Sequence, residues 1–497
     1  MTAVAHELAV MAEQVTARGV HGVVAAAAPL AAQAGAAALR DGGNAYDAAV
    51  AAALAETVLL PPKCGFGGDL VAIVIPGAGA RPISLVAVGG AAAAHAEVAR
   101  SGRWRDIGPD SVGPPAAAAG YTALAANGRL GRARLAEPAI GLALEGFAWA
   151  DVCTRLSAQA AALVAEMHPE GCAYYPHGRP IAAGSIVRLP GLADVLREWV
   201  DLGADLLAGP VGDAIVREVA ARGGALRADD FAAAAAEWID CASVELVAPA
   251  DSDDDGGVRR AWATPAPTHG PGLLAAVADH HASGDTSVAG LHCAVMTAID
   301  RQRRELGDPG GTSMVSAGDR SGTVVVVVHS NSYPRFGSGI VVPEYALTLA
   351  NRAGRGFTPE SGHPNFPERG RRPSTTLHAW VVSDATGTPR WAGGTPGGAN
   401  QLPWNAQTVS RLLEGEERPG VLVTSPLWEW LPDDDGVRVE SGFADADATA
   451  LAERAARVVT APRWGCKSAQ QVVRVPEVGA TWEAAADPRT VGLALGV

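Results

Sequence analysis

Lysine is almost missing from this chain, which has only Lys63 and Lys467 among its 39 basic residues. The formal net charge is -14, so no basic field is available to recruit nucleic acid or an anionic membrane surface. Aromatic residues make up only 5% of the chain, whereas alanine is abundant. This composition favours a small soluble substrate over a polymeric or membrane partner.

Paired cysteines, a signal peptide and long apolar runs are also missing. The six cysteines show no CxxC spacing, which indicates free thiols in a reducing compartment. The stretch from Met1 to Gly19 lacks the basic start and the continuous apolar run of a signal peptide, and no window is long enough to span a bilayer. We therefore expect a cytoplasmic protein.

A glycine-rich loop at residues 63–69 raises the question of a nucleotide or cofactor. It follows a predicted alanine-rich helix and precedes the apolar strand 70–75, whereas a phosphate-binding loop lies between a strand and a helix. We expect no nucleotide, cofactor or metal. Cys64 beside Lys63 is either an activated thiol or an inert buried one, and the second interpretation is favoured.

The order of predicted elements indicates a mixed core of helices and strands. A strand over 21–26 is followed by a helix that Pro29 opens, and Asn44 with Asp47 caps the next helix. Pro138 is expected to open a further helix. With 497 residues, of which 48% are hydrophobic, the chain can form two or three average domains or one large layered unit.

The centre of the chain is a predicted β-hairpin that begins at a threonine. Thr312 follows two glycines, residues 324–328 are all valine, and residues 319–322 have turn chemistry. If the turn is centred there, Thr312 lies opposite Ser330, with Cβ atoms roughly 5 Å apart. Two hydroxyls would then face one substrate.

A threonine hydroxyl needs a neighbouring base to act as a nucleophile. Cleavage between Gly311 and Thr312 would free an α-amine with a pKa of about 8, which could serve as this base. The glycines permit the strained backbone that brings the hydroxyl onto its own preceding carbonyl. The alternative is an ordinary loop entering a buried hairpin, since Gly-Gly-Thr alone is a weak signal.

A second hairpin is predicted over residues 375–392. A Thr-Pro-Gly-Gly turn at 395–398 follows it, before a helix over 401–413. The backbone N–H groups of Gly397 and Gly398 can point at a developing oxyanion, an interaction worth roughly 3 kcal/mol per donor. An ordinary connecting turn is the other interpretation.

Taken in order along nearly the whole chain, these segments resemble the γ-glutamyltransferase (γ-glutamyltranspeptidase) family of N-terminal nucleophile hydrolases. The motifs concerned are Gly42-Gly43-Asn44-Ala45, Gly65 with Gly67-Gly68, Pro138-Ala139-Ile140, Gly307-Asp308-Pro309, Thr312 with Ser316 and Asp319, Phe336-Gly337-Ser338-Gly339 and Thr395-Pro396-Gly397-Gly398. The resemblance implies an α+β fold, the four-layer αββα sandwich. It also implies self-cleavage into a large chain, 1–311, and a small chain, 312–497, that remain associated; a homodimer of such heterodimers is left open.

The same resemblance implies roles for residues around the hairpin. Thr312 would be the nucleophile, Ser330 the second hydroxyl beside it, and Gly397 with Gly398 the oxyanion turn. The residues that would bind substrate are Asn331, Thr375 and Thr376.

Three departures from the family pattern bear on the substrate. The arginine motif that clamps a glutamate α-carboxylate is replaced at 86–92, and the acidic residue expected after Asn351 is missing. Losing such charge-assisted contacts weakens binding strongly, so glutathione is not the expected substrate. The segment before the nucleophile is short, which predicts that self-cleavage is slower or uses a different backbone geometry. Positive charge near the hydroxyl pair comes instead from Arg355, Arg369, Arg371 and Arg372. Arg355 is predicted to bind substrate. The alternative is that all four side chains are simply solvated.

The sequence therefore predicts a self-processing threonine hydrolase that acts on a substrate other than glutathione. By resemblance to relatives recruited to antibiotic pathways, the reaction would be hydrolysis of a bond next to a carbonyl, a carbon–carbon bond included, during alkylproline biosynthesis. One alternative is a conventional γ-glutamyl or N-acyl amide hydrolase or transpeptidase. The other is a non-catalytic binding protein on the same fold.

Overall fold

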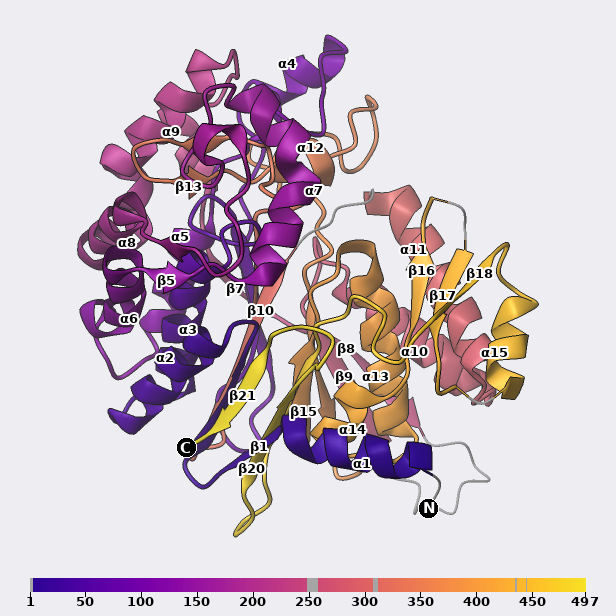
Figure 1. The fold of residues 1–497 in the computed structure, drawn as a ribbon. Helices are drawn as coiled ribbons and strands as arrows, with labels where there is room; N and C mark the ends of the chain where they lie inside the picture. Colours follow the sequence, from indigo (N-terminus) through magenta and orange to yellow (C-terminus); the bar gives the residue numbers. More distant parts are fainter. Residues whose placement is uncertain (1–2, 248–257, 307–311, 434–435, 444) are drawn as a thin grey trace.

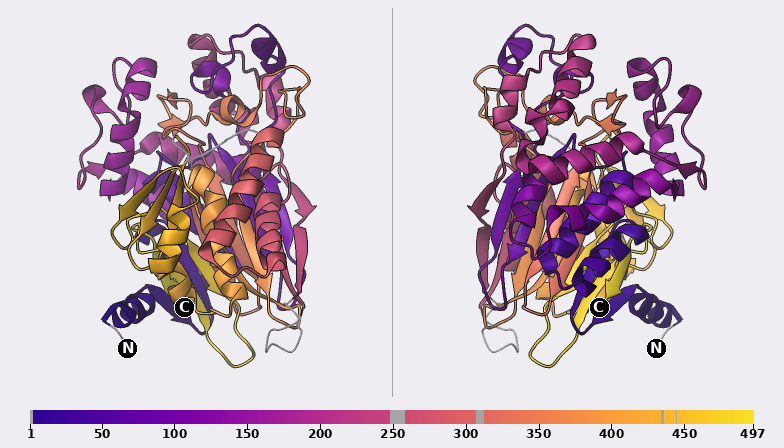
Figure 2. Two further views of the ribbon diagram at one scale, coloured as in Figure 1. Left: turned by 90° about the vertical axis from the view of Figure 1, so that its right-hand side faces the viewer. Right: turned by 90° about the vertical axis from the view of Figure 1, so that its left-hand side faces the viewer.

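The computed structural model describes residues 3–247, 258–306, 312–433, 436–443 and 445–497. Two seven-stranded sheets lie face to face, and helices cover the outer face of each (Figures 1 and 2). This is the four-layer α+β sandwich that the resemblance implied. Among the helices of the described residues, none is both long and apolar enough to cross a membrane.

Both sheets are antiparallel throughout. The first has the order β21-β2-β10-β11-β3-β4-β7, with β21 (Leu493–Gly496), β2 (Gly22–Ala26), β10 (Ser313–Asp319), β11 (Val324–Ser330), β3 (Asp69–Ile75), β4 (Ile83–Ala87) and β7 (Glu237–Asp240). The second has the order β1-β20-β19-β15-β14-β9-β8, with β1 (Thr16–Gly19), β20 (Trp482–Ala486), β19 (Gln471–Arg474), β15 (Pro389–Gly394), β14 (Ala379–Ser383), β9 (Val258–Ala263) and β8 (Ala242–Val247). Each sheet combines strands from both halves of the chain, so the two halves form one folded unit.

The helices form the two outer layers. The first sheet is covered by α2 (Pro29–Arg40), α3 (Ala45–Leu59), α5 (Ala117–Ala125), α6 (Arg132–Glu145) and α8 (Pro190–Leu202). The second is covered by α10 (Gly270–Ser283), α11 (Val288–Leu306) and α13 (Gln401–Leu413). Helix α14 (Pro419–Thr424) packs on β19 and β20 of the same sheet. Peripheral helices are α1 (Ala3–Val15), α4 (His95–Arg100), α7 (Asp151–Met167), α9 (Pro210–Ala221), α12 (Arg352–Gly356) and α15 (Asp445–Ala452). Small sheets pair β5 (Phe147–Ala148) with β6 (Ile186–Val187), β12 (Val341–Val342) with β13 (Leu347–Thr348), and β16 (Trp428–Leu431) with β17 (Gly436–Glu440) and β18 (Val458–Ala461).

Three apolar clusters separate the four layers. The alanines of α3 pack on one face of the first sheet, where Val315 points outward. The other face of that sheet meets the second sheet, with Met314 and Trp262 in the cluster between them. A third cluster lies between the second sheet and its helices. The small alanine side chains allow the helices to approach the sheet closely.

The structure confirms one predicted helix start and contradicts another. The Asn44 side chain accepts from the N–H of Asp47, and Asp47 accepts from the N–H of Asn44 at 2.8 Å, which confirms the predicted cap of α3. The prediction for Pro138 was wrong, because α6 begins at Arg132 and contains Pro138 in its interior. Pro138 has no N–H to donate to the carbonyl of Arg134 one turn earlier, so the helix continues with one backbone hydrogen bond fewer.

Candidate active site

The predicted register of the central hairpin is confirmed. Ser313 pairs with His329, so the next step of the ladder sets Thr312 opposite Ser330. Ser330 in turn pairs with Asp69, the first residue of β3. Directly paired residues of neighbouring strands share a face of the sheet, so Thr312, Ser330 and Asp69 form a row across three strands.

This row faces the space between the two sheets. Met314, two residues after Thr312, belongs to the apolar cluster between the sheets, as does Val328, two residues before Ser330. Alternate residues of a strand point to the same side, which places the row at one end of that space. Thr312 and Ser330 are 1% and 0% exposed, so the Thr312 hydroxyl lies in an interior where water is scarce.

The side-chain amide of Gln401 connects Thr312 to the second sheet's side of the site. It lies 3.2 Å from Thr312 Oγ1 and 2.9 Å from Thr376 Oγ1. With Oε1 toward the two hydroxyls, it also accepts from the Gly398 N–H at 3.3 Å, while Nε2 donates to the carbonyls of Thr395 and Thr376. We adopt this orientation because it pairs both ends of the amide. One buried amide therefore contacts the Thr312 hydroxyl and the glycine turn together.

The glycine turn before α13 has a backbone that other residues would disturb. Gly398 has φ 62°, in the left-handed region. A Cβ on Gly397 would lie 2.2 Å from the Trp404 ring. Both glycines are therefore required by the local structure. The side-chain amide of Gln401 accepts from both the Gly398 N–H and the Thr312 hydroxyl, so it bridges the turn and Thr312. This geometry suits an oxyanion-binding turn.

The hydroxyl pair Thr375 and Thr376 is buried beside the turn. Thr376 O bonds to His378 Nδ1 at 2.7 Å, so this ring nitrogen carries the proton. Nε2 of His378 then accepts from Asn405 Nδ2 at 2.8 Å. Burial lowers the pKa of His378 to about 4, and the ring is neutral at neutral pH. This network fixes the backbone that presents the Thr376 hydroxyl.

Other residues singled out from the sequence lie apart from the Thr312 hydroxyl. The Asn331 side chain donates to the carbonyl of Pro61 at 3.2 Å, against the glycine-rich loop. Arg355 pairs with Asp106 at 3.0 Å. Their roles in binding substrate stay predictions. Gly311, on the other side of the proposed cleavage site, lies outside the described residues.

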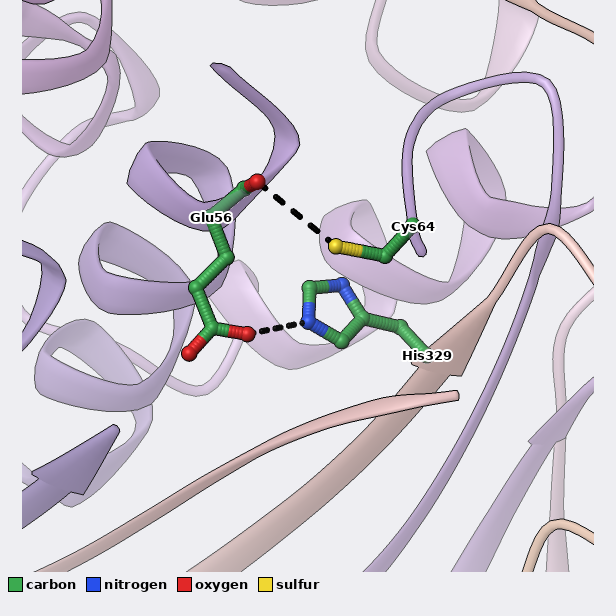
Figure 3. Close-up of side chains that lie close together, drawn as sticks. All are labelled: Glu56, Cys64 and His329. Carbon is green, nitrogen blue, oxygen red and sulfur yellow. Dashed lines mark hydrogen bonds and ion pairs between the residues drawn. The ribbon is translucent and has the colours of Figure 1, made fainter. Parts of the chain in front are cut away.

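Behind Thr312, on the helix side of the sheet, is a polar cluster that the sequence did not suggest (Figure 3). Glu56 Oε2 accepts from Ser313 Oγ at 2.7 Å and lies 2.9 Å from His329 Nε2. Its Oε1 accepts from the N–H of Ala27 at 2.7 Å. Tyr121 Oη lies 2.7 Å from His329 Nδ1 and completes this series of hydrogen bonds. The buried carboxylate of α3 thus holds the residue next to Thr312.

The same cluster contains atoms of the kind that bind metals. Ligand atoms of Glu56, Cys64 and His329 lie within 4.8 Å of one another (Figure 3). However, both Glu56 oxygens and both His329 nitrogens already have hydrogen-bond partners in the protein. Burial raises the pKa of Cys64 well above its ordinary value, so the thiol is protonated. These contacts explain the cluster as a hydrogen-bonded anchor, and Cys64 as an inert buried thiol.

Comparison with known proteins identifies the family. Residues 31–278 and 275–497 match the gamma-glutamyltranspeptidase family. The chain belongs to this family. The resemblance recognised in the sequence is thereby confirmed, and as a member of the gamma-glutamyltranspeptidase family the chain is an enzyme of the N-terminal nucleophile hydrolase type.

Three similar proteins are distant in sequence, and each match covers nearly all of both chains. The oxamate amidohydrolase proenzyme of Klebsiella pneumoniae subsp. pneumoniae is 27% identical, over 96% of this chain and 98% of that protein. A crystal structure of cephalosporin acylase from Bacillus halodurans is 25% identical with a TM-score of 0.82, over 97% of each chain. LmbA2991HD has the same fold, with a TM-score of 0.78 and 23% identity, over 97% of this chain and 99% of that one.

Gln401 offers a test of the site's geometry. Gln401→Ala removes the amide that holds both hydroxyls, so we expect self-cleavage and turnover to slow about 10- to 100-fold. The rate at which shorter chains appear on a denaturing gel measures the first effect. Gln407→Ala is the matched control, because Gln407 is also buried on α13 but bonds to the carbonyls of Pro403 and Trp428. Equal slowing in both variants would contradict the role of Gln401.

The buried histidine predicts acid sensitivity. His378 has a folded-state pKa of about 4, below its ordinary value near 6.5, so the unfolded chain binds more protons between these pH values. Unfolding free energy should therefore fall as pH drops from about 6.5 to 4, by about 3 kcal/mol from this group, and be unaffected by it above that window. Denaturant titrations against pH measure the slope. It should shrink in His378→Gln but not in His21→Gln, since His21 is exposed.

Proposed function

We propose that this enzyme is a self-processing threonine hydrolase, cut between Gly311 and Thr312, that cleaves a bond next to a carbonyl in a substrate other than glutathione. The observation that supports it best is the buried Thr312 hydroxyl, which Gln401 links to Thr376 and to the Gly398 N–H. The products of cleavage would be the chains 1–311 and 312–497. Because strands of both chains share each sheet, they would stay together.

In the proposed reaction, the freed α-amine of Thr312 takes the proton of its own hydroxyl as Oγ1 attacks the substrate carbonyl. Negative charge collects on the carbonyl oxygen, which the N–H groups of Gly397 and Gly398 stabilise. The bond to the leaving group breaks, and the amine returns the proton to that group. Water then hydrolyses the ester on Thr312. The carbonyl oxygen would displace Gln401 Oε1 from the Gly398 N–H.

The relatives support hydrolysis of an acyl bond. Two are named as an oxamate amidohydrolase and a cephalosporin acylase, and others as glutathione hydrolases, so the names support an acyl hydrolase without choosing the acyl group. Residues 86–92 of this chain contain no arginine to clamp a glutamate α-carboxylate. A γ-glutamyl substrate would therefore lack its main charged contact on that side of the site.

Cleavage of a carbon–carbon bond next to a carbonyl, during alkylproline biosynthesis, is the second candidate. It uses the same attack on a carbonyl, but the leaving group departs as a carbanion and must be protonated as the bond breaks. The resemblance to relatives from antibiotic pathways favours it, and LmbA2991HD shares the fold. Assays with alkylproline precursors and with N-acyl amides distinguish the two by which bond is broken.

Mass measurement of the purified chains tests the proposal first. Two fragments that meet before Thr312 are expected, and one intact chain with full activity would overturn the mechanism. γ-Glutamyl p-nitroanilide then tests the substrate. Turnover at ordinary enzymatic rates would favour the conventional γ-glutamyl hydrolase instead. Uncut protein that hydrolyses none of these compounds would favour a binding protein.

A further inference from the structure

Arg352 is a buried cation in which four of the five N–H donors have no hydrogen-bond partner among the described residues. The side chain is 3% exposed, and its Nε donates to Asp69 Oδ2 at 2.8 Å. Within the described residues, its Nη1 and Nη2 have no hydrogen-bond partner. Leaving charged donors unpaired in the interior is costly, so such groups are typically completed by an acceptor. The ion pair with Asp69 uses only one of the guanidinium nitrogens.

The position of Asp69 places this guanidinium beside the proposed nucleophile. Asp69 is the third member of the row that begins with Thr312 and continues through Ser330. Neighbouring strands are about 4.8 Å apart, so Asp69 lies roughly 10 Å from Thr312 across the sheet. Because all three residues face the space between the sheets, Arg352 reaches the same space from α12. The guanidinium of Arg352, bonded to Asp69, therefore lies near the end of the row that Thr312 begins.

We propose that Arg352 binds a carboxylate of the substrate, through Nη1 and Nη2, while Thr312 attacks a carbonyl elsewhere in the same molecule. The inference rests on the proposed function and adds to it the class of substrate, an anionic acyl compound. It also assigns the anchor to α12, whose Ala353 packs against Ala91 of the segment 86–92 in which the sequence lacks an arginine.

The chemistry of the site favours a carboxylate. The two terminal nitrogens of a guanidinium form a planar fork that matches the two oxygens of a carboxylate. Burial raises the pKa of the Asp69 carboxyl, and the adjacent Arg352 opposes this shift. The neighbouring His269 adds no charge at neutral pH, since burial, His378 and Arg352 lower its pKa to about 3.

The arginines that the sequence brought forward are placed differently. Arg355 is paired with Asp106, Arg371 with Glu368, and Arg372 with Glu237. Arg371 and Arg372 retain 35% and 24% side-chain exposure, so solvent screens their charge. Arg352 combines a charge, near-complete burial and two terminal nitrogens that have no hydrogen-bond partner among the described residues.

Binding is tested first, without requiring turnover. Sodium propionate is titrated against the purified protein at constant ionic strength, with sodium chloride as the reference, and the rise in Tm gives an apparent dissociation constant. Wild-type protein is expected to bind propionate, and Arg352→Lys to bind it about 10-fold or more weakly. The lysine keeps the charge opposite Asp69 but loses the fork. Arg438→Lys is the matched control, since Arg438, on the remote β17, pairs with buried Glu429 of β16.

Kinetics then separate substrate binding from a structural effect. Mono-p-nitrophenyl glutarate carries a free carboxylate, and p-nitrophenyl valerate is its neutral counterpart. For Arg352→Lys we expect KM to rise about 10- to 100-fold for the glutarate ester and to change less than about twofold for the valerate ester. If the lysine variant does not fold, the double variant Asp69→Asn, Arg352→Gln removes both buried charges together and is measured in its place.

Equal changes with both esters, or the same propionate constant in wild type and Arg352→Lys, would overturn the assignment. Stronger protection by inorganic phosphate than by propionate would overturn the choice of a carboxylate. Failure of the proposed function looks different. An uncut chain that reacts with neither ester, yet binds propionate through Arg352, would remove the hydrolase mechanism and leave the anion site.

Discussion

Thr312→Ala is expected to leave the chain uncut and to lower turnover by at least about 10³-fold, because the same hydroxyl performs both reactions in the proposed mechanism. Alanine removes the oxygen that attacks the preceding carbonyl, so no α-amine is released. It also removes the oxygen that would attack the substrate. Intact mass spectrometry and product analysis report the two losses separately. The fold should persist, since Thr312 contributes one small side chain just before β10.

Two variants control this experiment. Thr386→Ala makes the same substitution in the exposed turn between β14 and β15 and should leave cleavage and turnover unchanged. Ser330→Ala removes the second hydroxyl and should slow product formation without preventing it. A Thr312→Ala protein that is still cut, or that keeps ordinary turnover, contradicts the role of Thr312. Complete loss in Ser330→Ala with retention in Thr312→Ala would exchange the two roles.

Glu56→Ala is expected to cause the largest loss of stability, about 3 to 5 kcal/mol. The buried carboxylate accepts hydrogen bonds from Ser313 and from the N–H of Ala27, and it pairs with His329. Alanine leaves these groups without an acceptor and opens a cavity under β10. Because Ser313 would be the second residue of the small chain, its release should also slow self-cleavage. Urea unfolding of wild type and variant measures the difference.

The conservative change separates these effects. Glu56→Gln keeps one oxygen, which can serve both Ser313 and His329, but places its NH2 group opposite the N–H of Ala27, so we expect a smaller loss of about 1 to 3 kcal/mol. Glu477→Ala, at an exposed position, should stay within about 0.5 kcal/mol of wild type. If Glu56→Ala unfolds at the same urea concentration as wild type, the cluster does not anchor β10.

Local patterns in the sequence predicted the central hairpin, because turn chemistry and a run of valines fix both its ends and its register. The observed pairing of Ser313 with His329 follows from this turn. The same reasoning failed for Pro138, since proline is favoured in a first helical turn but is also tolerated where its lost hydrogen bond can be replaced by water.

The residues that act on Thr312 from a distance could not be found in this way. Glu56 precedes Ser313 by 257 positions, and Asp69 precedes Arg352 by 283. Gln401 gave one usable signal, a polar side chain in the first turn of the helix that follows the glycine turn. Nothing in its local sequence shows that it contacts Thr312, because that contact depends on how the two sheets are stacked.

By itself, the sequence determined two strands before the central hairpin, the hairpin with its threonine at the mouth, and the order of motifs that marks the family. These depend on residues close together in the chain, where turn propensity and alternation are sufficient. Only the tertiary structure decided which buried groups surround Thr312. Packing of the four layers brings Gln401 of α13 to the Thr312 hydroxyl, Glu56 of α3 to Ser313 on the helix side of the sheet, and Arg352 of α12 to Asp69. The low dielectric of that interior makes each polar contact energetically important.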